Sequence, residues 1–109
     1  LLIIKPQLSG GLRNSQRIIH EANEHGVQCI LTTTIESGIT LAATLHLAAA
    51  TPSITLPCGL ATAHLLSNDL LRTMLPIRDG MLTVPKGPGL GIELDREALF
   101  SNARGHITP

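Results

Sequence analysis

The polar residues best suited to chemistry follow short apolar runs of the chain. Lys5 ends the apolar run Leu1–Ile4, and Thr32, Thr33 and Thr34 end a second, β-rich run. A lysine at the end of a buried strand is partly desolvated, which favours the neutral amine that can accept a proton. A solvated lysine in a loop is the ordinary alternative, and position alone slightly favours it.

Glu36 and Ser37 follow the threonines, and Glu36 has two open interpretations. Glu36 could hold a cation or orient Lys5 from the neighbouring strand. It could equally cap the helix predicted to begin near Gly38, where a carboxylate interacts favourably with the helix dipole. The threonine hydroxyls could bind a substrate carboxylate, although threonine is also a common strand residue.

An alternation of strands and helices must position these residues. Apolar periodicity and Gly/Pro breaks predict the order strand, helix, strand, helix, strand end. Such an order indicates right-handed βαβ units on a parallel sheet, whose ligands meet the carboxyl ends of the strands. We therefore expect one polar rim, made by Lys5, the three threonines with Glu36 and Ser37, and Gly59 with Thr62. The predicted ranges are Leu1–Ile4, Leu12–His25, Val27–Thr33, Ile39–Ala50 and Cys58–Leu60.

The remainder of the chain has a different pattern. Residues 61–75 are predicted to form a loop with a helical turn, and Arg78-Asp79-Gly80 to form a hairpin turn. A small strand over Ile92–Leu94 and a helix from an Asp95 cap to Phe100 are expected after the Gly/Pro loop at 86–91. That loop has the wrong glycine order for a phosphate-binding loop.

Composition excludes several classes of protein. The chain has 109 residues, eight basic and eight acidic, so its net charge of zero argues against a nucleic-acid protein. A hydrophobic content of 43% argues against a disordered chain. Two cysteines are too few for a disulfide framework or a zinc site, and a reduced cytoplasmic setting is expected. No apolar run is long enough for a membrane helix. Five scattered histidines, of which only His64 lies near a predicted strand end, make no metal site.

Six motifs in order resemble the carboxyl-terminal part of the enolase superfamily. The most similar subgroup is the muconate-lactonising-enzyme-like one, and within it the o-succinylbenzoate synthase family. The similarity extends from Leu1 to about Leu94. The motifs are Ile3–Pro6 with Gly10-Gly11, Thr33–Gly38, Ala48–Ala50, Gly59–Thr62, Asp79-Gly80 and Val84–Gly91.

The resemblance implies a fold and a chemistry. It implies an α/β fold in which residues 1–75 form about strands 6 to 8 of a TIM-type (β/α) barrel. Residues 76–109 would form a hairpin and a tail that returns to a capping domain preceding Leu1. The chemistry would be proton removal next to a carboxylate, with Mg²⁺ stabilising the enediolate. The metal ligands and a second lysine have no counterpart here and are expected upstream of Leu1, so the chain alone is expected to be inactive.

The resemblance also assigns site residues. Lys5 matches the catalytic lysine of the sixth strand, and Thr32 and Gly59 match substrate-binding positions of the seventh and eighth strands. Glu36 and Ser37 are further substrate-binding candidates. The implied activity is a carbon–oxygen lyase that dehydrates a cyclohexadiene carboxylate in menaquinone or phylloquinone synthesis. An N-acylamino acid racemase, another member of the subgroup and a non-catalytic half-barrel are the alternatives.

Overall fold

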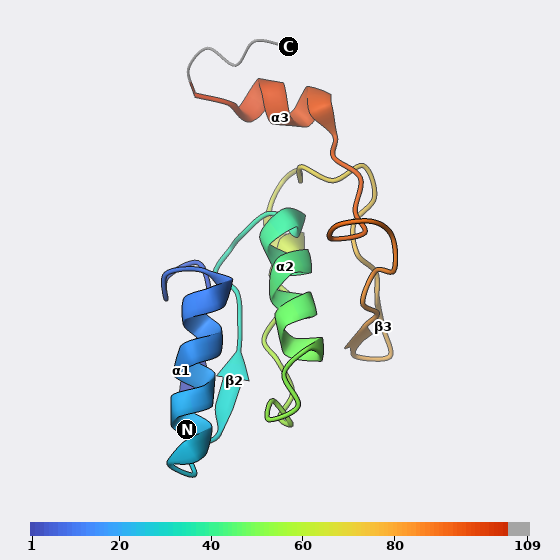
Figure 1. The fold of residues 1–109 in the computed structure, drawn as a ribbon. Helices are drawn as coiled ribbons and strands as arrows, with labels where there is room; N and C mark the ends of the chain where they lie inside the picture. The colour runs from blue at the N-terminus through green and yellow to red at the C-terminus, as the bar shows by residue number, and fades with distance from the viewer. Residues whose placement is uncertain (105–109) are drawn as a thin grey trace.

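Two short parallel strands and two helices form the first half of the molecule. The computed structural model describes residues 1–104; residues 105–109, the end of the predicted tail, lie outside the described part. Strands β1 (Leu2–Ile4) and β2 (Cys29–Leu31) pair in parallel, with Ile4 beside Leu31. Helices α1 (Leu12–Glu24) and α2 (Gly38–Ala49) lie side by side and cover one face of these strands (Figure 1). The predicted strand–helix alternation is confirmed.

The strands are shorter than predicted. The β-branched run predicts a strand from Val27 to Thr33. A strand forms a hydrogen-bonded ladder only where a neighbouring strand supplies partners. Because β1 has three residues, β2 is limited to three as well. The predicted third strand is reduced to one parallel bridge between Thr32 and Gly59. Only this bridge extends the sheet beyond β2.

Helix α1 is amphipathic, and its buried side explains its position. Ser15, Ile19 and Ala22 recur at the spacing of one helical face and are buried, whereas the charged side chains of α1 are exposed. Gly26, with a φ of 68°, follows the helix and turns the chain toward β2. The buried face packs on the strands in one core, formed by Ile4, Ile19, Ala22, Cys29, Leu31 and Leu47.

Helix α2 is apolar on more than one side because it separates two cores. Leu47 faces the first core, while Leu41 and Leu45 face a second core with Leu60 and Ala63. Residues of the chain's second half, including Leu82, pack against this second core. The tail is also tied to α2 by a hydrogen bond of 2.9 Å between Nε2 of His46 and the carbonyl of Leu90.

Between residues 63 and 104, the described part of the chain contains short elements only. A 3-10 turn η1 (Ala63–Leu65) precedes a hairpin of β3 (Ile77–Arg78) and β4 (Met81–Leu82), and α3 (Arg96–Asn102) follows. Asp79 and Gly80 have φ of 51° and 72°, as a two-residue hairpin turn requires, so the predicted turn is confirmed. The predicted Asp95 cap is confirmed by its bond of 3.0 Å from the Ala98 amide. The strand predicted over Ile92–Leu94 is only a bridge between Leu71 and Leu94.

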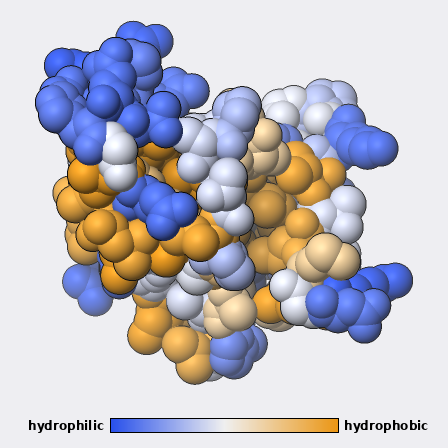
Figure 2. Space-filling view, turned by 90° about the horizontal axis from the view of Figure 1, so that it is seen from below, coloured by the Kyte–Doolittle hydropathy of each residue, from blue (hydrophilic) through white to orange (hydrophobic). Residues whose placement is uncertain are grey.

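Apolar side chains remain exposed outside the two cores. Figure 2 shows hydrophobic surface beside hydrophilic residues on the side seen from below. The most exposed large side chains include Leu1, Ile3, Leu8 and Met81. Ile3 lies on the face of the strands that the helices do not cover, because its neighbour Ile4 faces the helices. Within residues 1–104, no helix has the length and hydropathy needed to cross a membrane.

Candidate functional site

Three of the predicted site residues lie in one row at the carboxyl ends of adjacent chain segments. The register that places Ile4 beside Leu31 places Lys5 beside Thr32 one residue further on. The amide of Thr32 donates to the Ile4 carbonyl at 3.0 Å, and Thr32 is bridged to Gly59. The structure thus brings together Lys5, Thr32 and Gly59, as expected for the carboxyl edge of a parallel sheet.

The row faces away from the helices. Ile4 and Leu31 point into the core beneath the helices, and side chains alternate along a strand. Lys5 and Thr32 therefore point to the uncovered face. A Cβ atom at Gly59 would lie 2.9 Å from Oγ1 of Thr32, so the open side of Gly59 faces the same way.

Lys5 is half-buried and carries the only charge of this row. Among residues 1–104, no carboxylate lies within 4.0 Å of its ammonium group. An ammonium group without a protein counter-ion, beside a hydroxyl and a glycine backbone, favours an anionic ligand over a cationic one.

The two threonines after Thr32 serve local structure. Thr33 is 3% exposed, and its Oγ1 lies 2.7 Å from Oγ1 of Thr62. Its amide also donates to the Gly59 carbonyl at 3.0 Å. These bonds hold the 59–62 segment against the end of β2, so of the three threonines only Thr32 lies in the row.

Among residues 1–104, Glu36 forms no ion pair with Lys5 and no capping hydrogen bond to α2. Its Oε1 accepts hydrogen bonds from the amide of Thr34, at 3.0 Å, and from the Thr34 hydroxyl. Its Oε2 is buried and has no partner among the described residues. The interpretations of Glu36 as a cap of α2 or as a direct partner of Lys5 are therefore wrong, while its possible contact with substrate stays a prediction.

The carboxylate at the start of α2 comes from Asp69 instead. Ser37 occupies the cap position, but its side chain makes no capping hydrogen bond. Oδ1 of Asp69 accepts from the Gly38 amide at 2.8 Å. Sequence reasoning missed this residue because capping side chains are sought within a few positions of a helix start, whereas Asp69 is 31 residues away.

The described residues do not form a metal site. Residues 1–104 contain no group of three or more His, Cys, Asp or Glu side chains placed to hold an ion. His64, the one histidine near the predicted rim, is exposed and lies in η1. The donor set therefore does not fit Mg²⁺ within this part of the chain, and no step below is assigned to a metal.

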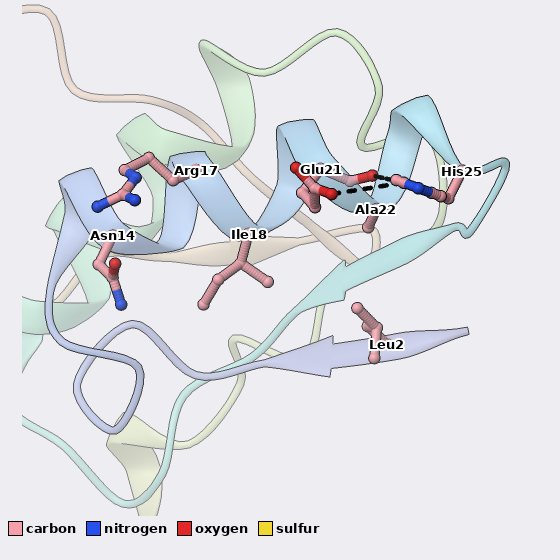
Figure 3. A pocket seen from close by; sticks show the side chains of 7 residues that line it. All are labelled: Leu2, Asn14, Arg17, Ile18, Glu21, Ala22 and His25. Carbon is pink, nitrogen blue, oxygen red and sulfur yellow. Dashed lines mark hydrogen bonds and ion pairs between the residues drawn. The ribbon is translucent and has the colours of Figure 1, made fainter.

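A cavity of about 460 Å³ lies elsewhere, between β1 and α1. Figure 3 shows Leu2, Ile18 and Ala22 at its apolar side. Glu21 and His25 lie at its rim, where Nδ1 of His25 is 2.9 Å from the Glu21 carbonyl. None of Lys5, Thr32 and Gly59 lines this cavity, so it is separate from the row.

Comparison with known proteins places the chain in a family. Residues 1–98 match the family described as Enolase C-terminal domain-like. Muconate cycloisomerase 1 of Rhodococcus opacus is 35% identical over 99 residues, which are 91% of this chain and 26% of that protein.

Solved structures agree with this match. A muconate lactonizing enzyme from Klebsiella pneumoniae superposes with a TM-score of 0.80 at 27% identity, over 89% of this chain and 27% of that chain. An enolase from Thermobispora bispora complexed with magnesium and formate gives 0.82 at 39% identity, over 92% and 24%.

These matches fix the fold class. They confirm the predicted α/β fold of the carboxyl-terminal part of a (β/α) barrel. The chain spans about a quarter of the length of these relatives. On its sequence and its structure alike, the chain belongs to the enolase C-terminal domain-like family.

Proposed function

We propose that this chain is the carboxyl-terminal part of a barrel enzyme that moves a proton at the carbon next to a substrate carboxylate. The observation that carries the proposal is the row of Lys5, Thr32 and Gly59 at the carboxyl edge of the sheet. In barrel enzymes this edge carries the reacting groups. The family match supports the same reaction class.

Lys5 is the proposed catalytic residue. The residue is half-buried, its side chain faces the uncovered side of the sheet, and its ammonium group has no carboxylate partner in the described part of the chain. A group so placed can stabilise negative charge that develops on a bound carboxylate, or, when neutral, accept a proton from the adjacent carbon. Thr32 would donate or accept a hydrogen bond beside it, and Gly59 would leave room for the substrate.

The proposed specific activity is that of an o-succinylbenzoate synthase, a carbon–oxygen lyase. In such an enzyme a second lysine, outside this chain, would remove the proton, and Lys5 would hold the charged intermediate as a cation. The row offers one positive charge and no acid, which suits a carboxylate substrate. Residues 59–62 contain no carboxylate that could bind a substrate ammonium group, which argues against a dipeptide epimerase.

A cycloisomerase is the second candidate. The observation that favours it is the 35% identity to muconate cycloisomerase 1 of Rhodococcus opacus. An N-acylamino acid racemase is the third candidate. The residues of the row are compatible with all three activities, so a substrate assay must decide.

The implied partner is the rest of the same enzyme. β1 has a free edge, one face of the sheet is uncovered, and the relatives are about four times longer. We propose that the preceding part of the protein supplies the remaining strands, the Mg²⁺ ligands and the second lysine, in a cytoplasmic enzyme. A non-catalytic half-barrel would instead be a cooperative, monomeric fold made by this chain alone.

The test is a comparison of substrates with the complete enzyme. The cyclohexadiene carboxylate, muconate and N-succinyl amino acids are offered at equal concentration, and kcat/KM is measured for each. A preference for dehydration of the cyclohexadiene supports the synthase. Preferred lactonisation of muconate or preferred racemisation would replace it by the corresponding candidate. Absence of all three activities, with a folded protein, would contradict the proposed reaction class.

A further inference from the structure

We propose that Asp69 is a positioning residue for the loop between β2 and α2, residues 32–37. This inference rests on the proposed function, because that loop carries the candidate substrate residues Thr32, Glu36 and Ser37. Asp69 itself lies outside the Lys5 row, in the segment that follows η1. It would act on the site only through the loop.

The carboxylate of Asp69 joins two distant parts of the chain. Its Oδ1 accepts from the amide of Gly38, the first residue of α2, at 2.8 Å, and from the amide of Leu70 at 2.7 Å. The first amides of a helix lack partners within the helix, and a negative charge there also interacts favourably with the dipole. Since the Ser37 side chain makes no such bond, Asp69 supplies the side-chain cap of α2 within the described residues.

Asp69 and Leu71 both pack closely against Gly38. Gly38 is buried, and a Cβ atom built on it would overlap Leu71 and would lie 2.5 Å from Oδ2 of Asp69. Leu71 is 6% exposed and is bridged to Leu94. The Asp95 amide also donates a hydrogen bond to the Leu70 carbonyl at 2.8 Å. The segment that carries Asp69 is therefore fixed in place by its bonds to residues 94 and 95. Asp69 is thus a fixed anchor for the start of α2.

The loop has few other anchors beyond Thr33. Within residues 1–104, the Glu36 side chain is hydrogen-bonded only to Thr34, so this interaction stays within the loop. Ile35 is 61% exposed. With Thr33 held by Gly59 and Thr62 at one end, Asp69 fixes the other end. Loss of Asp69 should therefore loosen Glu36 and Ser37 more than Thr32, which the sheet bridge retains.

The experiment compares Asp69→Ala and Asp69→Asn with Asp95→Ala in the complete enzyme. Asp95 is the matched control because it caps α3 through an equivalent bond, to the Ala98 amide at 3.0 Å, away from the loop. We expect Asp69→Ala to raise KM about tenfold and to leave kcat within about threefold. The tenfold change in KM is the size expected when one charged capping interaction is lost. Asp69→Asn, which retains an oxygen acceptor, should recover part of the affinity. Asp95→Ala should leave KM within about twofold.

Hydrogen exchange of the same variants gives an independent readout. Exchange over residues 33–38 should accelerate in Asp69→Ala and stay unchanged in Asp95→Ala. Equal KM changes in the two alanine variants, or accelerated exchange at 33–38 with an unchanged KM, would overturn the positioning role. Should Asp69→Ala fail to fold, Asp69→Asn is compared with Asp95→Ala instead. Smaller changes in KM and in exchange over residues 33–38 are then expected. An enzyme inactive on every proposed substrate refutes the proposed function, while unchanged exchange refutes the anchor.

Discussion

Replacement of Gly59 by alanine tests whether Thr32 and Gly59 share one face. The new Cβ would lie 2.9 Å from Oγ1 and 3.1 Å from Cβ of Thr32, closer than ordinary contact distances. Thr32 would have to rotate and would lose the bond of 3.1 Å that its hydroxyl donates to the Thr33 carbonyl. Overpacking costs about 1–3 kcal/mol and a lost hydrogen bond about 1 kcal/mol, so we expect about 2–4 kcal/mol of destabilisation.

A double-mutant cycle isolates this contact. Thr32→Ala removes both Oγ1 and its hydrogen bond, so Gly59→Ala should cost about 2 kcal/mol less in that background than alone. Thr32→Val is the matched control, because it keeps a branched side chain of the same shape and should relieve only the hydrogen-bond share, about 1 kcal/mol. Thermal unfolding of the complete enzyme measures the effect, at about 2–4 °C per kcal/mol. Strictly additive Tm changes for Gly59→Ala and Thr32→Ala would refute the shared face.

Two further substitutions test the first core. Leu31 is 0% exposed and lies between the sheet and the helices. Leu31→Ala should therefore destabilise the protein by about 2–5 kcal/mol, measured as a decrease in Tm. A change under about 1 kcal/mol would contradict its burial. Burial also raises the pKa of the Cys29 thiol above its ordinary value of 9.0. The folded state then keeps a proton that the unfolded state releases, so the stabilisation is full below about pH 9 and is lost as the pH rises through the folded pKa. Cys29→Ala should therefore show a smaller fall in unfolding free energy between about pH 8 and about pH 10 than the parent; equal pH profiles would contradict this.

Local sequence signals predicted the elements well where neighbouring residues determine them. The Asp79-Gly80 turn follows from the positive φ that these residue types tolerate, and the Asp95 cap follows from its position before α3. The amphipathic stripe of α1 likewise depends only on spacing along one helix.

Strand length and the anchors of the site depended on distant residues. The Val27–Thr33 run has the composition of a longer strand, but its ladder ends where β1 ends. The bond between Thr33 and Thr62 and the cap that Asp69 gives to α2 join residues about 30 positions apart. No local pattern encodes such pairs, so their existence required the tertiary structure.

The row at the carboxyl edge could be predicted in part. Parallel strand order alone placed Lys5, Thr32 and Gly59 at one rim, and the register confirms that they are neighbours. One of the two interpretations of Glu36 placed it at the helix start, because it precedes Gly38 in sequence, but its carboxylate accepts a hydrogen bond from the Thr34 amide instead.

The most direct test of the proposed function is the turnover of the complete enzyme with Lys5→Ala. Lys86→Ala is the control, because Lys86 is the only other lysine of the chain and is exposed. We expect kcat of Lys5→Ala to fall by about 10²–10³, the usual loss when a group that stabilises developing negative charge is removed, while Lys86→Ala retains the parent rate. A Lys5→Ala enzyme with near-parent kcat would remove Lys5 from the mechanism and contradict the proposed active site.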